Sequence, residues 1–264
     1  MSSQMKNAPV YFTIGQIRFN PILSLPTFIP GIQDNFRKHG FADFKKAVTM
    51  TFAFSSGGNK DSESQMPPPQ PVERFLFSDI SNTQNFQLDQ GSLSFQSTKY
   101  EVFEKFAAEL VKGLQMVNEM VGGLSFVERV GLRYLDAVTP KQGEELSQYL
   151  IPEALGLYGR LKGRTKHTFS ETLAESPDAS VISRVVAQEG QIGFPPDLVL
   201  NQLNIAQSFA NFTGVHAVLD TDAFFAERMA YNAAEVEKRL DKLHDRIMEA
   251  FRALVTDHAL GVWQ

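Results

Sequence analysis

The side chains with the clearest capacity for binding chemistry are Arg129 and Arg133, which flank Gly131 in a segment with strand periodicity. Alternate residues of a strand share a face, so both guanidinium groups project on one side and the glycine leaves room between them. Such a pair can clamp a carboxylate or a phosphate. The competing interpretation is structural, with both arginines bridging to carboxylates such as Glu101 or Glu104 on a covering helix.

Other cations are candidates for the same kind of site. Arg18 and Arg74 lie in two further strand patterns and are candidates for the same sheet face as Arg129 and Arg133, although the register of the strands cannot be read from sequence.

A second basic group is the alternating series Arg160, Lys162, Arg164 and Lys166. In an extended chain, at about 3.3 Å per residue, these four side chains form a stripe about 20 Å long on one face. The stripe is suited to a phosphate backbone or an acidic partner. The favoured alternative is an edge strand protected by its charges, because the chain as a whole has a net charge of −5.

An acidic group, Asp220-Thr221-Asp222, directly follows an apolar strand pattern that contains His216. Two carboxylates and an imidazole are suited to a divalent cation. The favoured interpretation is a turn that caps the following helix, which requires the same residue types. The other histidines are scattered, and His244 is expected to be solvated. No metal site, cofactor or catalytic residue is therefore predicted.

The composition is that of a globular protein. The 264 residues are 43% hydrophobic and include 22 phenylalanines but no cysteine, which excludes disulfides, thiolate metal sites and a cysteine nucleophile. The N-terminus lacks a secretory signal, and no apolar run approaches the roughly 20 residues that span a bilayer. We expect a cytoplasmic protein with no membrane partner.

Hydrophobic periodicity predicts the elements that position these groups. Strands are expected at 10–20, 48–54, 73–77, 86–88, 93–95, 125–138, 164–173, 180–189 and 204–219. Helices are expected at 25–38, 100–121 and 229–254, with one or two short helices at 142–158. Gly15 is interpreted as a bulge, and the Ser-, Gly- and Pro-rich stretch 55–71 as a disordered loop between two strands. A terminal turn capped by Thr256 closes the chain.

This order of elements favours an α+β fold with a mainly antiparallel sheet and two long helices. Hairpin strands lead to a long helix twice, which suggests two similar halves. We divide the chain into an N-terminal α+β half, 1–140, and a β-rich C-terminal half, 141–264, that ends in the longest helix.

That last helix has a heptad seam, with apolar residues spaced 4, 3, 4, 3, 4, 3 and 4 apart from Met229 to Leu254. One interpretation is an interface for self-association or a partner helix. The other is packing on the chain's own sheet or on the 100–121 helix. The candidate interface residues are Val236, Leu240, Leu243, Ile247 and Leu254.

Three short motifs occur together in this chain: RFNP at 18–21, ERF at 73–75 and VGLRYLD at 130–136. In this order and in a chain of this length, they resemble a sporadically distributed family of uncharacterised bacterial proteins of about 250 residues. The resemblance covers nearly the whole chain and implies no activity and no catalytic residues. Patchy distribution is typical of mobile accessory genes, including defence and toxin-antitoxin systems.

The leading hypothesis from sequence is a non-enzymatic interaction or regulatory protein, in the form of an accessory component of a bacterial defence or toxin-antitoxin-like system. The alternative is a protein that binds nucleic acid, or processes it with a metal held by Asp220 and Asp222. A third hypothesis is an enzyme that anchors a small anionic substrate with Arg129 and Arg133.

Overall fold

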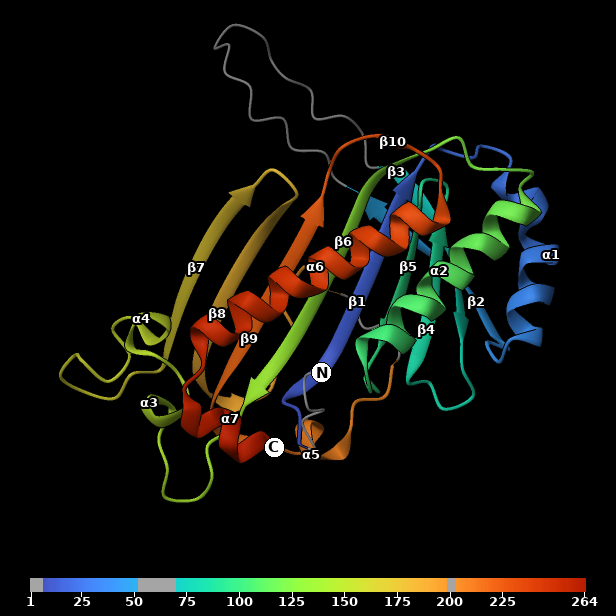
Figure 1. Cartoon of the computed structure of the whole chain (residues 1–264). Coiled ribbons are helices and arrows are strands. Elements are labelled where there is room, and N and C mark those ends of the chain that lie inside the picture. The colour runs from blue at the N-terminus through green and yellow to red at the C-terminus, as the bar shows by residue number, and fades with distance from the viewer. Residues whose placement is uncertain (1–6, 52–69, 199–202) are drawn as a thin grey trace, which may run out of the picture.

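The computed structural model describes residues 7–51, 70–198 and 203–264, and it shows one large sheet with its longest helices against one face (Figure 1). The strands are β1 (Val10–Phe19), β2 (Asp43–Thr51), β3 (Gln70–Ser78), β4 (Gln84–Asp89), β5 (Ser92–Ser97), β6 (Phe126–Val138), β7 (His167–Ser176), β8 (Ala179–Gln191), β9 (Thr213–Phe225) and β10 (Met229–Ala230). The helices of the described residues are α1 (Leu25–Lys38), α2 (Phe103–Met120), α3 (Leu146–Tyr149), α4 (Pro152–Leu155), α5 (Gln207–Ala210), α6 (Ala233–Leu254) and α7 (Asp257–Trp263).

The α+β fold with an antiparallel sheet is therefore confirmed. The sheet dominates, and α1, with 14 residues, is a third substantial helix beside α2 with 18 and α6 with 22, so a description by two long helices is incomplete. The predicted loop 55–71 lies outside the described residues up to 69, and β3 begins at Gln70.

The strand order is β2-β3-β4-β5-β1-β6-β9-β8-β7, and each pairing is antiparallel. The first strand of each half, β1 or β6, lies at the centre, and the last strand of each half, β5 or β9, pairs with it. The two halves thus share a connectivity and form one continuous sheet. By this connectivity β6 begins the second half, although it precedes the boundary placed at residue 140.

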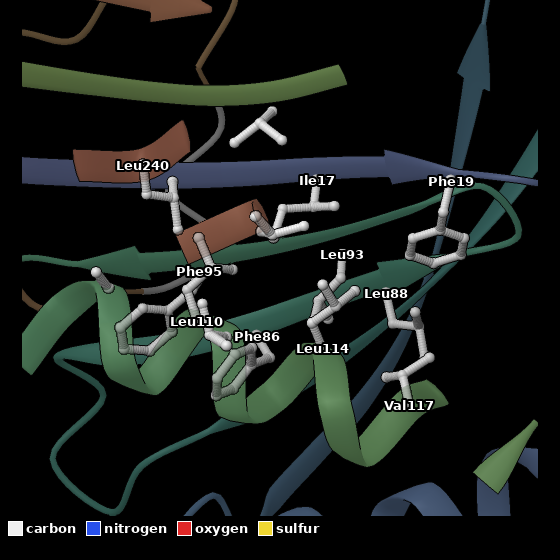
Figure 2. Close-up of a cluster of buried hydrophobic side chains, with 14 of the residues drawn as sticks. Ile17, Phe19, Phe86, Leu88, Leu93, Phe95, Leu110, Leu114, Val117 and Leu240 are labelled. Carbon is white, nitrogen blue, oxygen red and sulfur yellow. The ribbon is translucent and has the colours of Figure 1, made fainter. Parts of the chain in front are cut away.

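The helix side of the sheet holds the main core. The apolar stripe of α2 packs on β4 and β5, whose helix-side residues are phenylalanines and leucines. Figure 2 shows this contact between the sheet and the helix, through Phe86, Leu88, Leu93, Phe95, Leu110, Leu114 and Val117. Burial of this apolar surface contributes about 25 cal/mol per Å² to holding α2 against β4 and β5.

The seam of α6 lies in the same core. Val236, Leu240, Leu243 and Ile247 are at most 1% exposed and pack against the sheet and α2. Asn232 caps the helix, since its side chain accepts hydrogen bonds from two backbone N–H groups of the first turn. Among the described residues, no helix has the length and apolar character needed to cross a membrane.

Gly15 is a packing site and not the expected bulge. The register of β1 against β6 shifts near its two ends, between Val10 and Phe12 and after Arg18. A Cβ on Gly15 would lie 2.4 Å from a methyl carbon of Leu110, so the glycine allows α2 to approach the sheet.

The opposite face, here called the polar face, is the face of the sheet away from α1, α2 and α6. Residues 192–198 and 203–212 lie against it, where a strand had been expected from 204. The Tyr11 hydroxyl donates to the Gly193 carbonyl at 2.7 Å, and Phe194 packs edge-on against Tyr11 and Phe12. This contact holds residues 192–198 across the centre of the sheet.

Candidate functional site

Strand β6 presents one sequence motif to both faces of the sheet. Arg129, Gly131 and Arg133 lie on the polar face, whereas Tyr134 and Asp136 face the helices, because strand side chains alternate. The expectation that the two arginines share a face, with Tyr134 on the other, is confirmed.

Arg133 is the centre of a buried ion-pair network on the polar face. Its Nε donates to Asp220 Oδ1 at 2.6 Å, its Nη2 donates to Asp220 Oδ2 at 2.7 Å, and its Nη1 donates to Asp197 Oδ2 at 2.6 Å. Burial alone would lower the pKa of Arg133, but the bonds to Asp220 and Asp197 raise it above its ordinary value. Arg133 therefore stays charged and ties β6 to β9 and to residues 192–198.

Arg129 is held more loosely. A Cβ on Gly131 would lie 2.5 Å from its Nη1, so the glycine provides the space in which this guanidinium lies. Its Nη2 is 3.7 Å from Asp222 Oδ2, and burial lowers the pKa of Arg129 although Asp222 opposes the shift. The carboxylates that pair with the two arginines come from β9 and residue 197, and not from the 100–121 helix that the structural interpretation gave as an example.

Three arginines lie in one row across the polar face. Arg18 is directly opposite Arg129, Ser92 is opposite both Arg18 and Asp89, and the β3–β4 register continues the row to Arg74. Arg18 and Arg74 form no ion pair within residues 7–51, 70–198 and 203–264. Asp89 accepts hydrogen bonds from the following turn. The row therefore has three cations and one carboxylate, Asp89, and a second carboxylate, Asp222, lies 3.7 Å from Arg129 at its end.

A cavity of about 150 Å³ adjoins this row and is closed on one side by Asp197 and Leu198. A single water molecule requires only about 10–15 Å³ of such space, so the cavity can hold several waters or one polar group of a ligand. Its lining is mainly polar and comes from β1, β3, β4 and β5, with the cation Arg74, the carboxylate Asp89 and the uncharged side chains Gln16, Gln87, Ser92, Ser94 and Gln96.

Two of the lining amides are buried without a partner. Gln87 is 8% exposed and Gln96 is 4% exposed, and neither Gln87 Nε2 nor Gln96 Oε1 has a hydrogen-bond partner in the described part of the chain. Asn85, which pairs with Gln96 in the sheet, is fully buried, with both polar atoms of its side chain also unpartnered. Each unmade bond costs about 1–3 kcal/mol, so these atoms would gain from a ligand or water that completes them.

A separate polar cluster lies on the helix side. The hydroxyls of Tyr100 and Tyr134 are 3.0 Å apart, and Tyr134 is 3.1 Å from Nδ1 of His244, whose ring stacks on Phe103. His244 is therefore half-buried and bonded, which corrects the expectation that it is solvated. Asp136 is buried nearby, and desolvation raises its pKa to about 7.

The basic stretch does not form a strand. Strand β7 begins at His167, and positive φ angles of 70° at Gly159 and 104° at Gly163 turn the chain before it. The side chains of Arg160, Lys162, Arg164 and Lys166 are exposed in this loop, so strand alternation does not align them in a stripe. Arg164 forms an ion pair with Glu189 on β8. Whether these cations bind anything stays a prediction.

The acidic group is not a turn. Asp220, Thr221 and Asp222 lie inside β9, and Asp220 is 1% exposed because Arg133 neutralises it. Burial raises the pKa of Asp222, and Arg129 opposes that shift. Across the described ranges, no three His, Asp or Glu side chains gather as metal ligands. The cap of α6 is Asn232, not either aspartate.

The candidate interface residues of α6 are mostly interior. Val236, Leu240, Leu243 and Ile247 have no exposed surface to offer a partner, because the sheet and α2 already cover them. Leu254 is half-buried and lies at the rim of a groove. The structure therefore places the seam in the chain's own core, which was the alternative to an interface.

Sequence reasoning found Arg18, Arg74 and Arg129 but not the glutamines and serines between them. The period-2 pattern of β4 and β5 is visible in the sequence, but only its apolar residues entered the prediction. Gln87, Ser94 and Gln96 alternate with buried phenylalanine and leucine, and a polar series of this kind on interior strands was the available signal.

No protein-family model matches this chain, and no curated protein matches it. The resemblance carried by the RFNP, ERF and VGLRYLD motifs therefore stays a prediction.

Proposed function

We propose that this is a non-enzymatic binding protein and that the cavity on its polar face recognises a polar ligand with an anionic group. The observation that carries the proposal is the pair of buried atoms Gln87 Nε2 and Gln96 Oε1, which lie in the same cavity lining as the guanidinium of Arg74; none of these groups has a partner among the residues that the structure describes. Buried polar atoms without hydrogen-bond partners are energetically unfavourable. A ligand that supplies the missing hydrogen bonds would remove this cost, so a site with such atoms is suited to ligand binding.

The chemistry of the lining points to a nucleotide, either free or at the end of a strand. Primary amides both donate and accept hydrogen bonds, as base edges do, and arginine binds phosphate in bidentate fashion. The cavity is smaller than typical small-molecule pockets of about 300–1,000 Å³. It would hold one group of the ligand, while the remainder lies along Arg18 and Arg129.

The spacing of the row supports an extended ligand. Arg74 lies three strand positions from Arg18, about 14 Å at the usual spacing of 4.7–4.9 Å, and Arg129 is one strand further. Nucleic-acid binding, the alternative hypothesis from sequence, would then require neither the basic loop 160–166 nor a metal. A regulatory role would then follow from ligand occupancy.

The test is fluorescence anisotropy with a labelled 12-nucleotide single-stranded RNA, with competition by the four ribonucleoside monophosphates and by inorganic phosphate. Arg74→Gln and Gln87→Met should each weaken binding at least tenfold. Lys112→Gln, on an exposed position of α2, removes the same charge from the helix side and should leave binding unchanged. Removal of one phosphate contact should also reduce the salt slope by about 0.7.

Gln87→Met separates binding from folding. It replaces a buried amide, whose Nε2 has no partner among the described residues, with a side chain of similar size, so the variant should be as stable as the wild type or more stable. Equal binding by Arg74→Gln, Gln87→Met and Lys112→Gln would rule out this cavity. An acidic peptide that competes while nucleotides do not would instead identify a protein partner for the arginine row.

A further inference from the structure

A second hollow lies on the helix side of the sheet, between the β7–β8 edge and the C-terminal half of α6. Its volume is about 460 Å³. Figure 1 shows β7 and β8 at one edge of the sheet, with α6 crossing diagonally in front of the neighbouring strands. The walls and floor are lined mostly by small or apolar side chains, among them Ala174, Ala179, Val181, Ala250, Ala253 and Leu254.

The groove exists because the two halves of the fold cover their outer strands differently. In the first half, the connection from β1 to β2 forms α1, whose 14 residues pack on α2 and β3 and bury Leu25, Ile29, Ile32 and Phe36. In the second half, the connection from β6 to β7 forms α3 and α4, with four residues each. Helix α4 contacts β7 and β8 but ends at Gly156, with a φ of 56°.

The charges at the groove are mainly negative. Glu153, Glu175 and Glu249 line it, and the lining cation, Arg246, is already bonded to Glu249 at 2.9 Å and to Asp178 at 3.3 Å. The lining thus has three glutamates against one arginine, and Glu249 shares its charge with Arg246, so a partner that enters the groove meets an apolar floor and a rim with excess negative charge.

The floor also has an incomplete polar group. Ser183 Oγ is buried and has no hydrogen-bond partner among the residues that the structure describes, although Ser183 lines the groove.

We propose that this groove binds a basic amphipathic helix of a partner protein, in the role that α1 has on the outer strands of the first half. The partner's apolar stripe fills the space above Ala174, Ala250 and Ala253, and its lysines or arginines face Glu153 and Glu249. This inference is independent of the polar-face cavity, because the two sites lie on opposite faces of the sheet.

The probe is a fluorescein-labelled 18-residue peptide with leucine and alanine at i, i+3, i+4 and i+7 and lysine on both flanks. A second peptide has glutamate in place of lysine. Anisotropy is measured with the full-length protein at 150 mM salt. We expect the lysine peptide to bind at least tenfold more tightly than the glutamate peptide, and the Glu153→Lys/Glu249→Lys variant to reverse this preference.

Two substitutions on β7 give a matched pair. Ala174→Trp fills the groove, whereas Leu173→Trp places the same side chain on the other face of the same strand, where the residue is 57% exposed. Ala174→Trp should weaken binding of the lysine peptide at least tenfold, and Leu173→Trp should not.

The proposal is overturned if the lysine peptide does not bind the wild-type protein, or if it binds Ala174→Trp as tightly as Leu173→Trp. Light scattering after size-exclusion chromatography tests whether a second copy of the chain fills the groove instead. A wild-type dimer that Ala174→Trp converts to a folded monomer would show that a second copy of the chain fills the groove, and would also overturn the proposal.

Discussion

The pH dependence of stability should depend strongly on Asp136. Asp136 is buried on the helix side, with 6% of the residue exposed, and no hydrogen bond or ion pair to its carboxylate is present within the described parts of the chain. Desolvation raises its pKa from 3.8 to about 7. Between these two values the folded protein retains a proton that the unfolded chain has lost, so stability falls as pH rises through this window.

The magnitude follows from the shift. A change of about three pH units, at about 1.36 kcal/mol per unit, corresponds to on the order of 4 kcal/mol of lost stability above pH 7. Asp136→Asn stays neutral at all pH values. The variant should therefore match the wild type near pH 4 and exceed its free energy of unfolding by up to about 4 kcal/mol at pH 8.

Neighbouring titratable groups do not obscure the difference in free energy of unfolding between Asp136→Asn and the wild type. Burial raises the pKa of Tyr100 to about 12 and raises that of Tyr134 well above its ordinary value, so both stay neutral over the range. Burial lowers the pKa of His244, but that histidine is present in both proteins, so its contribution largely cancels in the difference.

The assay is urea unfolding at pH 4 to 8, followed by the fluorescence of Trp263, which is the single tryptophan and is 6% exposed. Glu237→Gln, at an exposed position of α6, controls for the loss of one acidic charge. A difference between Asp136→Asn and wild type that is flat with pH, or a variant that is less stable at pH 8, would refute the reasoning.

Two further predictions concern packing and charge, and both use urea unfolding at pH 7. Arg133→Met should cost about 3–5 kcal/mol because it leaves Asp220 buried without its main partner, whereas Asp197→Asn, whose side chain is 63% exposed, should cost less than about 1 kcal/mol; similar losses would argue against a buried pair. Gly113→Ala should lose about 1–2 kcal/mol despite the better helix propensity of alanine, because its Cβ would lie 2.3 Å from the Phe86 ring. Gly261→Ala in α7 meets no atom within 4 Å and should gain about 0.5–1 kcal/mol, so a gain at both glycines would contradict the packing argument.

Local patterns were sufficient to predict most of the secondary-structure elements, though not all of their bounds, and the side of the sheet that the β6 side chains face. Helix 25–38 was predicted with the bounds that the structure has, because Pro26 near the start and Gly40 beyond the end mark it locally. Alternation in β6 correctly separated Arg129 and Arg133 from Tyr134, since a strand has a fixed period of two. The heptad seam correctly indicated a packed helix, but it could not say whether the packing partner was internal.

Only the tertiary structure determined where the charged and polar groups lie and which partners they contact. Asp220-Thr221-Asp222 has the local composition of a turn, yet it lies in an interior strand because Arg133, 87 positions earlier in the chain, neutralises Asp220. The strand order then brings β1, β3, β4 and β5 together to form the polar-face cavity. No local pattern contains this information, because register and strand order are set by which distant surfaces bury each other, and burial is what converts a solvated polar residue into a paired or an unpartnered one.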